Sequence, residues 1–181
     1  MSLSVSQPPD IDPSALRRTL GRIPTSVAVV TAAGQDGPIG MTVGSLTSVS
    51  SAPPLVAFFG IAASHTFGQL ADADQFCINV LAEEQAEVCY GFASRTGTKF
   101  DLGSWELRCS QAPRLHGAAA WIECTRESVF EAGDHLGMMG RVRHVDYTDD
   151  RPLIFHRGKL SRLHPGANRD VCTTRLDWWT L

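Results

Sequence analysis

Short apolar runs separated by polar turns dominate this chain, and they predict strands rather than long helices. The first run, residues 27–31, contains only β-branched residues and alanine, which favour extended structure. An Asp36-Gly37 turn follows, and residues 39–46 are predicted to return as its hairpin partner. After two prolines, residues 55–61 form an apolar run with the length of a buried strand.

The second half of the chain carries the same kind of pattern. Residues 76–81 and 153–155 are short apolar runs, while residues 118–130 and 136–147 place apolar side chains between polar ones. Five to seven strands, mostly linked by hairpins, are expected together with two or three short helices. The fold class predicted is therefore mainly β, an antiparallel barrel or sandwich with peripheral helices.

Three segments carry helix signals. Asp12 followed by Pro13 is an N-cap with proline in the first turn, and Gly21 stands where a C′ glycine would end that helix. Ser64 is placed to N-cap a second helix, and residues 83–93, with acids in the first turn, predict a third.

Composition narrows the function. A chain of 181 residues with net charge −3 is long enough for one domain, and its scattered cations provide no footprint for nucleic acid. No apolar run approaches the ~20 residues of a membrane span, and the N-terminus lacks a secretory pattern. Five cysteines, an odd number without a CxxC pair, argue against a disulfide framework or a zinc site. These features predict a cytoplasmic protein with no metal and no membrane partner.

The two ends of the chain differ from its middle. Residues 1–11 are expected to be a disordered arm, and residues 12–163 to form the single domain. The tail, residues 164–181, lacks periodicity but ends in Trp178 and Trp179. Because two exposed tryptophans would be unusual, the tail is expected to dock on this subunit or on a neighbouring one.

Several common catalytic motifs are missing from the sequence. It contains no GxGxxG after a strand, no GxxxxGK[ST], no GxSxG and no HExxH. Hydrolytic and metal-dependent reactions therefore have little support. An organic cofactor that carries the chemistry itself would explain the absence.

Hydroxyl side chains gather in residues 40–66. A first group follows the hairpin: Thr42, Ser45, Thr47, Ser48, Ser50 and Ser51. A second, Ser64 and Thr66, arrives one strand later at a predicted helix start. Such hydroxyls are common on the solvent face of a strand, but two groups meeting at a helix N-terminus can bind one phosphate. The stretch is interpreted as a cradle for a flavin phosphate.

Six segments in the same order resemble the flavin reductase-like domain family, over residues 21–160. They are the strand IPTSVAVVT (23–31), the block GMTVGSLTSVS with PPLV, the Ser-x-Thr helix start, the strand FCINVL, Phe92-Ala93 followed by Lys99-Phe100, and Gly133-Asp134-His135 ahead of Gly140-Arg141-Val142. The resemblance implies an FMN-binding split β-barrel, usually a homodimer. It also implies reduction of FMN or FAD by NADH or NADPH, often for a partner monooxygenase.

The resemblance also implies site residues. Thr25 and Ser26 would lie at the edge of the flavin, and Ser26 stands where the family commonly has glycine. The ring and ribityl chain would be lined by Thr42, Ser45, Leu46, Thr47 and Ser48, and the phosphate would be bound by Ser64 and Thr66. Lys99 could add a charge to the phosphate or be a solvated loop cation, and Phe100 could cover the ring or the adenine.

His135 is the candidate catalytic residue, because the family motif places it against the nicotinamide. A lone histidine is more often a structural hydrogen-bonding residue, and this alternative stays open. Asp134 would orient the histidine or simply close the turn. Hydride transfer needs distance and stacking more than a strong acid or base, so the expected role is positioning.

The function expected is an NAD(P)H:flavin oxidoreductase whose reduced flavin reaches a flavin-dependent monooxygenase by diffusion. One alternative retains the flavin as a prosthetic group and passes electrons to another acceptor. Another is a flavin-binding module without catalytic activity.

Overall fold

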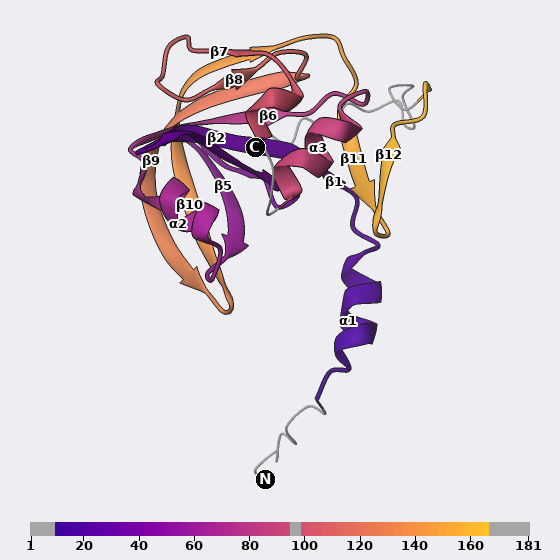
Figure 1. Ribbon diagram of the computed structural model, residues 1–181. Helices are drawn as coiled ribbons and strands as arrows, with labels where there is room; N and C mark the ends of the chain where they lie inside the picture. The colour runs from indigo at the N-terminus through magenta and orange to yellow at the C-terminus, as the bar shows by residue number, and fades with distance from the viewer. Residues whose placement is uncertain (1–9, 95–98, 167–181) are drawn as a thin grey trace.

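A seven-stranded antiparallel sheet forms the body of the protein. The computed structural model describes residues 10–94 and 99–166. The sheet has the order β3-β2-β6-β9-β10-β5-β4 and curls around a core, as Figure 1 shows. The mainly β prediction is confirmed. The strands are β2 (Ala28–Gly34), β3 (Gly37–Val43), β4 (Thr47–Ser51), β5 (Pro54–Ile61), β6 (Gln75–Val80), β9 (Ala120–Ala132) and β10 (His135–Tyr147).

Ser45, in the connection between the edge strands β3 and β4, bonds that connection to β5. Its hydroxyl donates to the carbonyl oxygen of Phe59 at 3.0 Å and accepts from the Phe59 N–H at 2.9 Å. Phe59 is in β5, beyond the part of that strand that pairs with β4. A single side chain from the β3–β4 connection therefore takes the place of a strand partner along this part of β5.

The barrel encloses the main hydrophobic core. Phe58, Phe76 and Met138 are fully buried there, and α2 (His65–Asp72) adds Phe67. The ring of Phe67 packs so closely on Gly60 that a Cβ at this glycine would lie 2.1 Å from it. The helix is therefore held directly against the backbone of β5.

A second apolar cluster lies outside the sheet, under α3 (Ala86–Ala93). It contains the buried side chains of Leu81, Phe92, Leu115 and Leu153. Smaller elements border it: β1 (Thr25–Ser26), β11 (Leu153–His156) and β12 (Lys159–Arg162) in one sheet, β7 (Trp105–Glu106) and β8 (Arg114–Leu115) in another, and η1 (Lys99–Leu102).

Asn79 links the sheet to the segment that covers it. Its Nδ2 donates to the carbonyl oxygen of Val29 at 3.0 Å and to Oγ1 of Thr31 at 3.1 Å. Its Oδ1 accepts from the N–H of Leu115 at 2.7 Å. The side chain is completely buried, so its amide satisfies buried groups that bulk water does not reach.

The first predicted helix is confirmed as α1 (Pro13–Leu20), with Asp12 as N-cap accepting from the N–H groups of Ser14 and Ala15. The C′ assignment of Gly21 is wrong. Its φ is −62°, an ordinary right-handed value, because the chain continues into a turn without a left-handed residue. No residue of α1 is buried, and Figure 1 shows the helix standing away from the barrel.

Two predicted boundaries need correction. The hairpin partner expected at 39–46 ends at Val43, and Thr47–Ser51 form the separate strand β4, which pairs with β5. The third helix begins at Ala86 rather than at residue 83, because Glu83 is tied to Arg151 by a backbone hydrogen bond.

The predicted arm falls mostly outside the described residues, and so does the tail with Trp178 and Trp179. In the described part of the chain, every helix is too short or too polar to cross a bilayer.

Candidate functional site

The hydroxyls of the sequence stretch 47–51 lie on the edge strand β4. Thr47 pairs with Ala57 and Ser48 pairs with Val56 of β5. Successive side chains of a strand point to opposite faces, so the two hydroxyls cannot serve the same face. Val56 belongs to the core face, and Thr47 therefore shares the outer face with Ala57.

The second hydroxyl group lies at the N-terminus of α2. Ser64 is its N-cap, and Oγ of Ser64 accepts from the N–H of Phe67 at 3.2 Å. The first helical bond runs from the N–H of Gly68 to the carbonyl of Ser64 at 3.0 Å. The amides of His65 and Thr66 precede that bond, as donors do at every helix start. Together with the hydroxyls of Ser64 and Thr66 they suit an anion.

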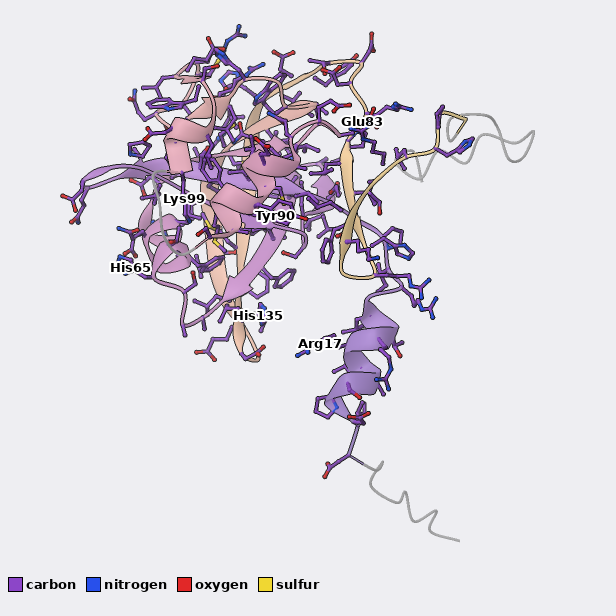
Figure 2. The ribbon with its side chains drawn as sticks, turned by 45° about the vertical axis from the view of Figure 1, so that its right-hand side comes forward. Arg17, His65, Glu83, Tyr90, Lys99 and His135 are labelled. Atoms are coloured by element: carbon purple, nitrogen blue, oxygen red, sulfur yellow. The ribbon has the colours of Figure 1, made fainter. Side chains whose placement is uncertain are left out.

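His135 begins β10 and is paired with Ile61, three residues before Ser64. The turn before it is joined to the same loop, since the N–H of Ala62 donates to the carbonyl of Asp134 at 3.1 Å. The histidine is thus held beside the N-terminus of α2. Figure 2 shows it at the lower end of the barrel.

The side chains of His135 and Asp134 are bonded to each other. Nδ1 of His135 lies 2.6 Å from Oδ1 of Asp134. This hydrogen bond, and then the charge of the histidine, hold the pKa of Asp134 below its usual value. An ionised carboxylate accepts the Nδ1–H, which leaves Nε2 directed away from it. The expectation that Asp134 orients the histidine therefore has a direct geometric basis.

Strand register places Thr47 and His135 on one surface of the sheet. Phe58 faces the core, so Ala57, Phe59 and Ile61 face outward. Their partners across the sheet share that outer face: Thr47 opposite Ala57, and His135 opposite Ile61. Register thus places Thr47 and His135 on the outer face of the sheet, while α2 begins three residues after Ile61 and packs Phe67 against Gly60 on the core side. That the two hydroxyl groups bind one phosphate stays a prediction.

Thr25 and Ser26 form β1, beside the turn that leads to Ser45. A Cβ added to Gly44 would lie 3.2 Å from Oγ1 of Thr25, so the absence of a side chain lets the two segments approach. Leu46 packs against the core cluster. The structure thus brings Thr25 close to the hydroxyl stretch, as the resemblance implies.

Three of the hydroxyls predicted to line the flavin donate within the chain. Oγ1 of Thr47 donates to the carbonyl oxygen of Ser48 at 3.2 Å, which leaves its lone pairs to accept a hydrogen bond. Oγ1 of Thr42 donates to the carbonyl of Cys89 in α3 at 2.8 Å. The Ser45 hydroxyl makes two hydrogen bonds with the backbone of Phe59. The sequence could not show this, because it reveals hydroxyls but not their partners. Contacts of these three residues with a flavin stay a prediction.

Lys99 and Phe100 lie at the other side of α3. The Lys99 ammonium donates to the carbonyl oxygens of Gly40 at 3.1 Å and Phe92 at 3.2 Å, and burial lowers its pKa. Phe100 packs edge-on against Phe92 and Trp105. Both line a pocket of about 220 Å³ to which neither β4 nor α2 contributes. One N–H of Lys99 remains for a phosphate, and that contact stays a prediction.

Sequence reasoning singled out neither of two aromatic rings near His135. Phe59 on β5 and Phe130 on β9 both lie opposite Gly137, two residues along β10 from the histidine. Their ring centroids are 6.0 Å apart at an interplanar angle of 89°. In the sequence both are ordinary members of apolar or alternating runs, so only the strand register reveals their position.

Comparison with known proteins agrees with this geometry. The family model described as "Flavin reductase like domain" matches residues 20–164. A flavin reductase of Pseudomonas putida is 44% identical over 150 residues, covering 82% of this chain and 88% of that protein. The reductase subunit HsaB of a flavin-dependent monooxygenase from Rhodococcus jostii is 36% identical over 156 residues, covering 86% of this chain and 80% of the relative.

A solved structure is also similar: the NADH:FAD oxidoreductase SgcE6 of Streptomyces globisporus, in complex with NAD and FAD fragments. It has a TM-score of 0.82 and 34% sequence identity, covering 87% of this chain and 96% of that one. The sequence match spans the barrel and the structural match reproduces it. The chain therefore belongs to the flavin reductase-like domain family.

Proposed function

We propose that this protein is an NAD(P)H:flavin oxidoreductase, which transfers a hydride from a nicotinamide to FMN or FAD and supplies reduced flavin to a partner monooxygenase. The observation that carries the proposal is the sequence of groups along β5: the Thr47 hydroxyl, then His135, then the N-terminus of α2. Relatives named as flavin reductase and as the reductase subunit of a monooxygenase support it.

The residues present fit a flavin. The neutral hydroxyl of Thr47, on the outer face of β4, suits the ribityl chain and ring edge, whereas Ser48 lies opposite the core residue Val56. The amides at the start of α2 suit a phosphate. A bound flavin supplies the two-electron acceptor. This chain's own residues bind and orient: Ser64 and Thr66 hold the phosphate, and Thr25 and Ser26 border the ring.

His135 acts on the other reactant. Its Nδ1–H is donated to Asp134, so Nε2 points away from that carboxylate and is left for a ligand. That nitrogen hydrogen-bonds the nicotinamide group of NADH or NADPH. Holding two planar rings at near-attack distance provides a large part of the rate enhancement available from orientation.

The activity is tested by mixing the protein with FMN or FAD and then with NADH or NADPH in a stopped-flow instrument. Loss of flavin absorbance is expected with at least one of the four pairs. No loss with any pair would overturn the proposal in favour of a non-catalytic flavin-binding module. Gel filtration after loading separates the remaining alternative, since a retained prosthetic flavin would co-elute with the protein.

Replacing Ser64 tests the phosphate site. We expect Ser64→Ala to weaken FMN binding by the ~1.5–3 kcal/mol of a hydrogen bond to a charged group, measured by fluorescence titration. Because this change also removes the N-cap, Ser64→Asp is the matched variant: aspartate caps the helix but repels a phosphate. Both variants should bind riboflavin, which has no phosphate, as the wild type does. Unchanged affinity of S64D for FMN would remove Ser64 from the site.

A homodimer is the second part of the proposal. It is supported by α1, which stands apart from the barrel while Leu16 and Leu20 remain 44% and 55% exposed on one side of it. A helix with an uncovered apolar side favours a second copy as its cover. The domain would then span residues 12–163, with the tail from residue 164 docking on the dimer.

This interface has its own test. Leu16→Glu combined with Leu20→Glu is expected to shift the protein from dimer to monomer in light scattering after gel filtration. The monomer should stay folded, because neither leucine is buried within the subunit. Arg18→Ala, on the opposite side of α1, is the control and should leave the mass unchanged. An unaltered mass for the leucine variant would exclude α1 as the interface.

We place the protein in the cytoplasm, where NADH and NADPH are available. The four cysteines in the described residues, at positions 77, 89, 109 and 124, are all free thiols. This fits a reducing compartment. Burial raises the pKa of the Cys124 thiol to about 12, so it stays protonated and unreactive.

A further inference from the structure

Phe130 lies on the outer face of the sheet, close to His135. Its partner across the β9–β10 ladder is Gly137, two residues along β10 from the histidine. A Cβ added to Gly137 would lie between 2.3 and 2.8 Å from three atoms of the Phe130 ring. The ring therefore occupies the space that a side chain on β10 would fill.

Gly137 is required for room and not for backbone conformation, since its φ lies outside the left-handed region. Phe59 adds a second constraint, because its ring packs edge-to-face against the ring of Phe130, at an interplanar angle of 89°. Phe130 is thus fixed in position by the backbone of one strand and by a ring on the next. It nevertheless remains 39% exposed, so part of the ring is uncovered beside His135.

We propose that Phe130 is a binding residue for the nicotinamide-bearing donor, and that its uncovered surface is the apolar wall against which a planar ring of the donor lies while His135 bonds it. This assignment rests on the proposed function. The position favours the donor, because Phe130 shares the outer face with His135, the residue assigned to the donor, whereas the Thr47 hydroxyl assigned to the ring edge of the flavin lies on β4. Two strands, β5 and β10, separate Phe130 from Thr47.

The chemistry of the contact is that of aromatic pairs. Planar rings attract each other in offset or edge-on arrangements beyond what their buried area accounts for. A wall already held in place by Gly137 and Phe59 loses little conformational freedom when the donor binds. Phe130 would therefore raise affinity for the donor and narrow its range of orientations, without contacting the phosphate cradle at α2.

The test uses Phe130→Leu, which keeps an apolar side chain but removes the ring. At saturating FMN we expect the KM for NADH, and the Kd of NAD⁺ for the FMN-loaded protein by calorimetry, to rise between about twofold and tenfold. The Kd for FMN itself should change by less than about twofold. Phe130→Tyr keeps the ring and should stay close to the wild type. Tyr147→Leu, an exposed aromatic at the other end of β10, is the control.

The other outcomes overturn the assignment. A raised Kd for FMN with an unchanged KM for NADH would assign the ring to the flavin. Unchanged constants together with a shift from dimer to monomer would assign it to a second copy. Should F130L fail to fold, Phe130→Met is measured in the same way. Failure of the wild type to oxidise NADH would refute the proposed function itself, whereas normal turnover by F130L would refute only the role of Phe130.

Discussion

Replacing His135 with alanine is expected to lower kcat/KM for NADH by about tenfold to a hundredfold, the loss typical of a misplaced reactant. The loss should appear mainly as a higher KM for NADH, while the Kd for FMN stays close to that of the wild type. The reason is geometric: the imidazole faces outward beside Ile61, whereas the proposed phosphate contacts come from α2. Steady-state kinetics at saturating FMN, with a separate flavin titration, measure both quantities.

Two further variants make this prediction sharper. Asp134→Asn removes the carboxylate that holds Nδ1 but keeps the size of the side chain, so it should produce a smaller loss of the same kind. His144→Ala, an exposed histidine further along β10, should change nothing. A larger effect of H135A on the Kd for FMN than on the KM for NADH would contradict the role assigned to His135.

Replacing Asn79 with alanine is expected to lower the free energy of unfolding by about 3 kcal/mol, because a buried group left without a partner costs about 1–3 kcal/mol. The variant removes the acceptor of the Leu115 N–H and the donor to Val29 and Thr31 at once. The position is completely buried, so bulk water does not reach these groups. Urea unfolding followed by fluorescence gives the value, and an unchanged m-value shows that the comparison is valid.

Gln75→Ala provides the control on the same strand. Gln75 is exposed and makes one long hydrogen bond, from the N–H of Gln111 at 3.3 Å. Its loss should cost less than about 1 kcal/mol. If N79A cost no more than Q75A, the link between the sheet and residues 110–115 would carry little of the stability.

The sequence predicts the strands that hold long apolar or alternating patterns, and the structure contains them. Residues 118–130, for example, belong to β9, and the Ser64 N-cap begins α2 as expected. It did not predict β1, β7, β8 and β12. Strands of two to four residues are formed by their partners, and carry too little periodicity to be recognised alone.

The candidate site was predictable where spacing along one strand decides it. Ser64 follows the end of β5 at the start of α2, as its spacing along the chain predicts. The pairing that brings His135 there joins β5 and β10, which lie far apart in the sequence, and the sequence pattern did not reveal it. The partners of individual side chains were not predictable. Thr42 and Ser45 look equivalent to Thr47 in the sequence, yet the structure bonds the first two to the distant residues Cys89 and Phe59, and Thr47 only to its neighbour Ser48.

The proposed site is divided between strands of unequal attachment. β4 is an edge strand with one neighbour, whereas β10 is hydrogen-bonded to both β9 and β5. Local opening of an edge strand breaks fewer hydrogen bonds than separating a strand that is paired on both sides. β4, which carries Thr47, can therefore open locally when reduced flavin leaves. β10, which carries His135, stays paired and keeps the conformation that binds the next nicotinamide. An enzyme that releases reduced flavin can in this way complete each turnover without changing the conformation of its nicotinamide site.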